Sequence, residues 1–285
     1  MSVINPEMTV PILLNTNNFV QNSKSTYRYN FPGVGLRLEQ GDKLALSSMY
    51  LYYSWFSITQ DYGNNKFTII INSISYNATV PDGYYSIEDL EKYIQHFCIQ
   101  NGLYLRNSNN EYVYYISLSN NPTRYRFQLH LTTLPTSLPT GWSQDPVSPF
   151  PFPTTSVTMQ LQFNDLFGKI IGFTAGTYPS SLQTSDYSVL GDKAPIINPV
   201  QSILIRCNMI SNGQFSNPTD LLDIFTVSKV NYGGIIKHEP SDSKYNSITP
   251  GKYNFIQIEL VDQNLNPIKL EDIEVSILLI FKINH

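Results

Sequence analysis

The fold class is decided by the segment IEVSILLIFKI, residues 273–283. Its odd-numbered residues are all apolar, whereas the even-numbered positions mix polar residues such as Glu274 and Lys282 with Leu278 and Ile280. Apolar residues that recur with a period of two predict a β-strand with one buried face. The two apolar residues on the other face indicate that this face is partly covered as well.

A second run with the same period precedes it, from Tyr253 to Val261, and places Ile256, Ile258 and Leu260 on one side. The residues between the runs, 262–267, are rich in turn formers. These features predict a long C-terminal β-hairpin.

Further strands are predicted along most of the chain, about ten in all, which is typical of a β-sandwich or jelly roll. They are 26–31, 34–38, 43–57, 66–71, 73–80, 111–118, 124–131, 157–163 and 200–209. One short helix is expected at about 86–100: Ser86 is a suitable N-cap, Glu88 and Asp89 follow in the first turn, and Asn101-Gly102 ends it. Its apolar face would consist of Ile87, Leu90, Ile94, Phe97 and Cys98. We therefore expect an all-β fold with one short helix.

The composition excludes several classes of function. Of the 285 residues, 41% are apolar and 14% charged, and the net charge is −4. The 18 basic residues form no cluster, which argues against a nucleic-acid reader and against a basic membrane-binding surface. Cys98 and Cys207 have no metal or disulfide spacing. We expect neither a signal peptide nor a transmembrane segment, because no long apolar run occurs.

Residues 133–155 contain six prolines and predict a long, semi-rigid loop rather than a strand. It is either an ordinary surface loop or a contact arm whose Phe150 and Phe152 dock on a neighbour. No shift in composition divides the chain, so we expect an N-terminal arm at 1–22 and one jelly-roll domain at 23–285, with the loop as an excursion.

No constellation of residues indicates catalysis, and we expect no enzyme activity, catalytic residue, metal or cofactor. The histidines, His96, His130, His238 and His285, form no metal-binding spacing. The pattern Asp262-x-Asn264-x-Asn266 matches the start of a calcium loop but lacks its glycine and its final glutamate, so we favour a plain connection between strands.

Four motifs in one order carry a resemblance to a known family. They are VPDGYYS at 80–86 before the helix, LFGKIIGF at 166–173 followed by GTY at 176–178, LIRCNMISN at 204–212, and the C-terminal segment with LVDQN at 260–264 and NPI at 266–268. In this order the chain resembles, from about residue 66 to 283, the penton or minor capsid proteins of Polintons, Polinton-like viruses and virophages.

The resemblance implies a single jelly roll that forms homopentamers at the vertices of an icosahedral virion, surrounded by double-jelly-roll major capsid proteins, with other minor capsid proteins as further partners. Gly83 and Gly172 would permit tight backbone conformations, and the C-terminal hairpin would supply central strands. Arg206 would either pair across a subunit boundary or face solvent. Loops at the sandwich edges and the N-terminal arm would make the subunit contacts. An Arg-Gly-Asp motif is absent, so no receptor site is carried over.

The alternative is a jelly-roll carbohydrate-binding module or lectin, in which some of the 20 tyrosines would stack on sugars. The lack of a signal peptide counts against this alternative, since most such modules are exported.

Overall fold

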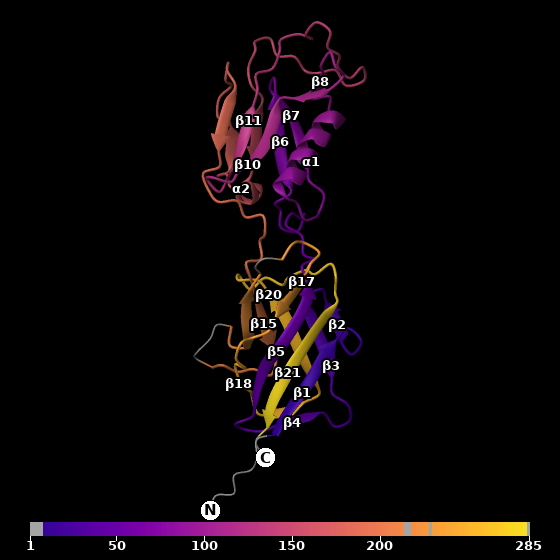
Figure 1. The fold of residues 1–285 in the computed structure, drawn as a ribbon, viewed down its shortest axis with the longest axis vertical. Helices are drawn as coiled ribbons and strands as arrows, with labels where there is room; N and C mark the ends of the chain where they lie inside the picture. Colours follow the sequence, from indigo (N-terminus) through magenta and orange to yellow (C-terminus); the bar gives the residue numbers. More distant parts are fainter. Residues whose placement is uncertain (1–7, 214–217, 228–229, 284–285) are drawn as a thin grey trace, which may run out of the picture. The chain divides into compact units, whose positions relative to one another are not determined.

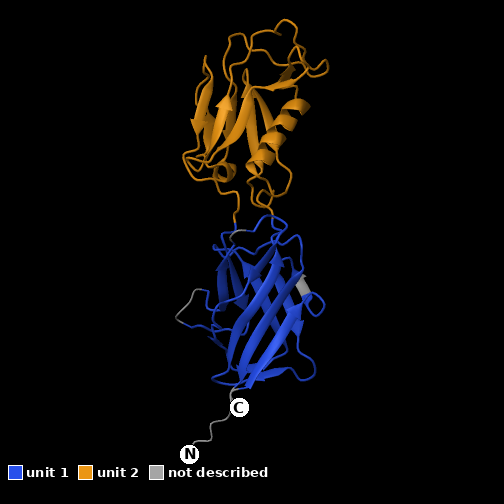
Figure 2. Cartoon of the chain, in the orientation of Figure 1, with its two compact units in different colours: residues 1–55, 200–285 blue, residues 56–199 orange. Residues whose placement is uncertain are grey.

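The computed structural model describes residues 8–213, 218–227 and 230–283. The chain divides into two compact units: unit 1 comprises residues 1–55 and 200–285, and unit 2 comprises residues 56–199 (Figure 2). Unit 2 is therefore an insertion in the chain of unit 1. This corrects the expectation of one domain over 23–285. Both units are rich in strands and alike in composition, so the sequence shows no boundary between them.

Unit 1 contains two antiparallel sheets (Figure 1). In their order of pairing, the strands of sheet A are β1 (Met8–Asn15), β21 (Val275–Ile283), β5 (Lys43–Tyr52) and β17 (Ile235–His238), with β18 (Asn246–Ser247) also paired to β5. Those of sheet B are β16 (Leu221–Thr226), β15 (Ser202–Cys207), β20 (Phe255–Val261), β3 (Thr26–Asn30) and β2 (Val20–Ser23). A small pair, β4 (Leu36–Leu38) with β19 (Gly251–Tyr253), completes the unit.

The order of the strands is that of a jelly roll. Eight strands of unit 1, in chain order, are β1, β3, β5, β15, β16, β17, β20 and β21. Sheet A pairs the first, eighth, third and sixth of them, and sheet B pairs the second, seventh, fourth and fifth. This interleaving of early and late strands in two sheets is the jelly-roll arrangement. The predicted fold class is thus confirmed, in unit 1.

The C-terminal strands are not a hairpin. β20 pairs with β15 and β3 in sheet B, whereas β21 pairs with β1 and β5 in sheet A. The turn-rich connection therefore crosses between sheets, an outcome that period-two patterns cannot distinguish from a hairpin. Both strands are central in their sheets, as the resemblance implied.

The expected N-terminal arm is, in its described part, a strand. β1 pairs with β21 from Met8 to Asn15, and Leu14 is fully buried. Pro11 lies within β1, which is an edge strand, where proline is tolerated because the donor it lacks is not needed for pairing. Residues 1–7 of the predicted arm lie outside the described residues.

Unit 2 packs its sheets and helices around one hydrophobic core. One sheet has the order β13 (Gly176–Tyr178), β12 (Gln160–Phe163), β6 (Lys66–Ile71) and β7 (Ile74–Thr79). Another has the order β10 (Ile116–Asn121), β11 (Arg126–Leu131) and β14 (Tyr187–Leu190), and β8 (Tyr104–Arg106) pairs with β9 (Tyr112–Tyr114). The helices are α1 (Ile87–Gln100) and α2 (Asp165–Ile171).

The helix predicted at 86–100 is α1. The Ser86 hydroxyl accepts from the Asp89 amide at 3.1 Å, and the Asp89 carboxylate accepts from the Ser86 amide at 3.2 Å, which closes a capping box. The predicted apolar face is the buried face. Gly102 follows with φ +66°, in the left-handed region that favours glycine at a helix end.

The second helix, α2, was not predicted. Asn164 caps it by accepting from the Phe167 amide at 2.8 Å, and Gly172 ends it with φ +76°. The expectation for Gly172 is thus confirmed. Gly83 does not have a positive φ, but a Cβ there would lie 3.0 Å from the Tyr85 ring, so a tight conformation at Gly83 stays a prediction. Its seven residues, which include Gly168, give too short a pattern to predict α2.

Residues 133–155 form a long loop whose only β pairing is through isolated bridges. Phe150 is 3% exposed and packs on Tyr115, with 5.4 Å between ring centroids, and on Phe152 at 5.1 Å. The proposed docking of Phe150 on a neighbour is therefore wrong, because its ring already belongs to the core of unit 2.

Candidate assembly surfaces

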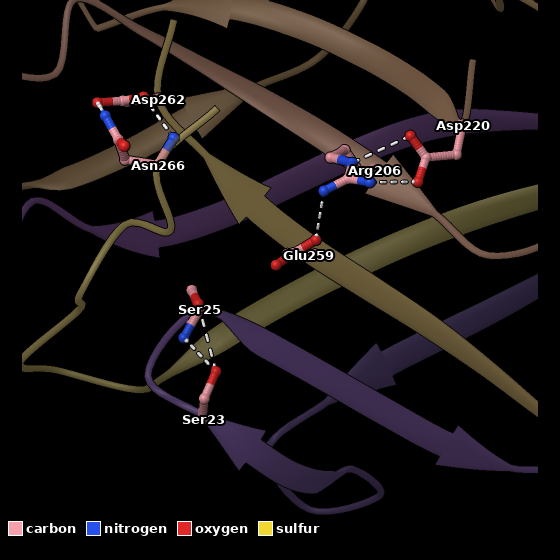
Figure 3. Close-up of polar contacts among 7 residues, drawn as sticks. All are labelled: Ser23, Ser25, Arg206, Asp220, Glu259, Asp262 and Asn266. Carbon is pink, nitrogen blue, oxygen red and sulfur yellow. Dashed lines mark hydrogen bonds and ion pairs between the residues drawn. The ribbon is translucent and has the colours of Figure 1, made fainter. Parts of the chain in front are cut away.

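The outer face of sheet B carries an ion-pair network centred on Arg206. Its Nε and one terminal nitrogen donate to the two carboxylate oxygens of Asp220, at 3.0 and 2.9 Å, and the other terminal nitrogen donates to Glu259 at 2.8 Å (Figure 3). Glu259 lies directly opposite Arg206 in the ladder of β15 and β20. We had left open a partner in another subunit or plain exposure to solvent. Arg206 instead pairs within its own chain, and the bidentate geometry fixes its orientation.

A buried carboxylate joins the two sheets at one edge of the sandwich. Asp223 on β16 of sheet B has a side chain only 3% exposed, and its Oδ2 lies 2.8 Å from Nε2 of His238 on β17 of sheet A. Lys244 Nζ lies 3.3 Å from the other oxygen. The His238 ring stacks on Phe225 with centroids 4.3 Å apart. Burial alone would raise the pKa of Asp223, but the hydrogen bonds and the nearby cation outweigh burial and hold this pKa below its usual value.

The same edge of sheet B is closed to strand addition by side chains. Asn212 Nδ2 donates to the Leu221 carbonyl at 2.6 Å, and Asn246 Nδ2 donates to the Leu222 carbonyl at 2.9 Å. These side-chain amides hydrogen-bond to backbone carbonyls of the edge strand β16, so the carbonyls do not accept from an added strand. A hollow of about 530 Å³ lies beside them and includes Asp223 in its wall. Because the polar groups around it bond to one another, we assign this region to stability of the fold.

The outer face of sheet A presents an apolar stripe. It consists of Pro11 and Leu13 on β1 and their register partners Ile280 and Leu278 on β21, and we call it the sheet A stripe. Leu13 is 52% exposed, and the two β21 residues are half-buried. Apolar residues side by side on an exposed sheet face are typical of a contact surface.

A shallow hollow of about 300 Å³ lies at one end of this face, lined in part by Tyr50, Tyr52 and Ile235. Ile235 is 57% exposed. The Tyr50 hydroxyl donates to Glu239 at 2.6 Å, and this hydrogen bond raises the pKa of Tyr50. Exposed tyrosines and aliphatic residues with few free charges resemble the composition of protein interfaces.

The histidines are not brought together. His96 is exposed on α1, His130 is half-buried on β11, His238 binds Asp223, and His285 lies outside the described residues. Within the described ranges, no group of three or more His, Cys, Asp or Glu residues is placed to hold a metal ion. No helix in the described part of the chain is long and apolar enough to cross a membrane.

Cys98 and Cys207 are buried in different units, and burial raises the pKa of each thiol to about 12. Both are core residues, as their isolated positions predicted.

The Asp262 loop has the geometry of a turn. Asp262 Oδ1 accepts from the backbone amides of Asn264 and Asn266, both at 2.8 Å, and Oδ2 accepts from the Asn266 side chain at 3.1 Å (Figure 3). Its carboxylate oxygens therefore stabilise the loop itself.

The fold and surfaces define a jelly-roll protein with an inserted second unit. In comparisons with known proteins, no family model matches the chain, and no curated protein matches it significantly. Among solved structures, the mavirus penton protein is 11% identical, with 98% of this chain and 100% of that chain covered and a TM-score of 0.47. The cryo-EM structure of the Sputnik virophage matches at 10% identity, with 98% of both chains covered and a TM-score of 0.44. Because both TM-scores lie below 0.5, we base the fold on the strand pairing of this chain itself.

Proposed function

We propose that this chain is a structural capsid protein without enzyme activity. It is a penton subunit that forms homopentamers at the five-fold vertices of an icosahedral virion and docks to double-jelly-roll major capsid proteins. The jelly roll of unit 1 supports this role, because capsid proteins are a frequent use of this fold. The order of motifs along the chain supports the narrower assignment to a penton.

The observation that carries the proposal is the sheet A stripe. A ring of five copies requires each subunit to offer one patch to one neighbour and a different patch to the next. The exposed apolar face around Leu13 and Leu278 supplies one such patch, and contact with a neighbour would remove its apolar area from water.

The experiment is the solution mass of the purified chain, followed by imaging of particles. We expect 162 kDa, five copies of 32.4 kDa, and density for the chain at the five-fold vertices. Leu13→Lys should abolish the pentamer. Val34→Lys is the matched control, because Val34 is 80% exposed in the same unit and does not belong to a strand of sheet A.

Two results would contradict the proposal in different ways. A chain that stays at 32.4 kDa and is missing from the vertices of particles excludes a penton. Pentamers that form equally well from both lysine variants would show that the ring uses another surface.

A further inference from the structure

The ribbon of β8 and β9 in unit 2 has one aromatic face. The register pairs Tyr104 with Tyr114 and Arg106 with Tyr112, so these four side chains share one side of the ribbon. The pair between them, Leu105 and Val113, belongs to the opposite side, which packs on the core. Within unit 2 the ribbon lies at the end opposite to that at which the chain enters and leaves (Figure 1).

The exposed part of this face, which we call the platform, is centred on Tyr112, which is 45% exposed, whereas Tyr104 is buried and Tyr114 packs partly against the core of unit 2. The rings of Tyr112 and Tyr114 are stacked nearly parallel, with an interplanar angle of 7° and centroids 6.2 Å apart. The Arg106 guanidinium lies 4.9 Å from the Tyr112 ring centroid and donates to the Tyr112 hydroxyl at 3.1 Å. Both contacts hold the exposed ring in place, which lowers the entropic cost of binding a ligand on it.

The proline-rich loop forms one border of the platform. Arg106 and Ser143 exchange two backbone hydrogen bonds, of 2.8 and 2.9 Å, which place the loop beside β8. Asp145 on this loop accepts from the Tyr104 hydroxyl at 3.3 Å. Backbone hydrogen bonds from Ser148 and Val147 lower the pKa of Asp145, so its carboxylate is an acceptor at neutral pH.

We propose that this platform, with the exposed ring of Tyr112, supported by Tyr114, as its stacking surface and Arg106 and Asp145 as its polar groups, binds a neutral saccharide. A pyranose ring has an apolar C–H face that can lie flat on an aromatic ring, and hydroxyls that both donate and accept. Arg106 supplies only donors and Asp145 only acceptors, a combination that suits neighbouring hydroxyls.

The charges of the site select a neutral sugar over an acidic one. Arg106 is the cation of the ribbon face and Asp145 is the carboxylate beside it, so the two charges balance. A neutral sugar can bond to both groups, whereas the carboxylate of an acidic sugar would be repelled by Asp145. This site lies in unit 2, outside the jelly roll, and does not depend on the proposed capsid role, since a single folded copy contains all of it.

The test is saturation-transfer NMR on the full-length protein with four neutral probes: cellotriose, maltotriose, mannotriose and triacetylchitotriose, with 3′-sialyllactose as the acidic probe. We expect saturable binding of at least one neutral probe and weaker binding of sialyllactose. Tyr112→Ala should weaken binding at least about tenfold. Tyr125→Ala is the matched control, because Tyr125 is 71% exposed on the β10–β11 turn of the same unit.

Three outcomes would overturn the proposal: no neutral probe binding below about 10 mM, binding that survives Tyr112→Ala, or a preference for sialyllactose. Because Tyr112 is exposed, its replacement leaves the fold intact, which circular dichroism verifies. The solution mass of the chain does not enter this test, so its result is separate from that of the capsid proposal.

Discussion

The contact between Asp223 and His238 is expected to hold the two sheets of the jelly roll together. We predict that Asp223→Asn destabilises unit 1 while leaving the shape of the side chain almost unchanged. The amide keeps the volume of the carboxylate but removes the charge that His238 and Lys244 face at 2.8 and 3.3 Å.

The magnitude follows from the burial of each partner. A hydrogen bond to a charged group contributes about 1.5–3 kcal/mol, and the 3% exposure of Asp223 leaves little room for water to replace it. Lys244 has a side chain 66% exposed, so its contact contributes about 0–1 kcal/mol. We therefore expect Asp223→Asn to lower the free energy of unfolding by about 2 kcal/mol.

The assay is urea unfolding followed by the fluorescence of Trp55 in a Trp142→Phe background. The chain has two tryptophans; Trp55 is buried in unit 1 and Trp142 belongs to unit 2, so this background reports on unit 1 alone. A double-mutant cycle with His238→Gln should give a coupling energy of at least about 1 kcal/mol. The corresponding cycle with Lys244→Gln should give less than about 0.5 kcal/mol.

The pH dependence provides a second reading of the same contact. The pKa of Asp223 is lower in the folded state than in the unfolded state, so its contribution is complete above the unfolded value of about 3.9. It is lost as the pH falls through the folded pKa. The stability difference between wild type and Asp223→Asn should thus shrink as the pH falls below about 4. A His238 coupling below about 0.5 kcal/mol, or a difference that does not shrink below about pH 4, would refute this reasoning.

Two further pairs of substitutions, each a test with its control, probe the packing. Tyr27→Phe should raise the stability of unit 1 by about 1 kcal/mol, since Tyr27 is 1% exposed and its hydroxyl has no hydrogen-bond partner among the described residues. Tyr253→Phe is the control: it removes a 2.7 Å hydrogen bond to the Thr249 carbonyl and should lower the stability of unit 1 in the same assay. Gly102→Ala should destabilise unit 2 by more than about 2 kcal/mol, because its new Cβ would lie 2.0 Å from the Ser148 carbonyl oxygen. Gly141→Ala has a similar φ of +78°, but its new Cβ would have no heavy atom closer than 4.0 Å, so it should lower the stability of unit 2 by only about 1 kcal/mol. Amide hydrogen exchange in β11 would compare the stability of the two alanine variants.

The sequence predicted what depends on local periodicity. Alternation in β21 and the capped apolar face of α1 identified both elements, because burial of one face imposes a period on the residues that form it. Which strands pair depends on contacts between residues that are far apart in the sequence. The C-terminal runs were therefore interpreted as a hairpin, although β20 and β21 belong to different sheets.

The surfaces were less predictable, and for a physical reason. Arg206 was recognised as a charge within a strand pattern, but its partner Asp220 lies outside the strands, and only the fold brings the two together. Asp223 sits in the run LLDIF, residues 221–225, and could have been recognised by the same signal. The sheet A stripe needed knowledge of the register between β1 and β21, which no local pattern contains.

The way in which unit 1 closes its edges indicates how a subunit of this kind would assemble. An unprotected edge strand pairs with any other strand, which leads to aggregation rather than to a ring. Here β1 carries Pro11, and the carbonyls of β16 accept hydrogen bonds from Asn212 and Asn246. Edge pairing is thus opposed at these two strands, while the sheet A stripe stays exposed. Contact through a face requires complementary shape, and a heterologous contact between faces can close into a ring with a defined number of copies. Protected edges at β1 and β16 beside an open face would thus suit the proposed role, in which subunits join through faces and stop at one ring.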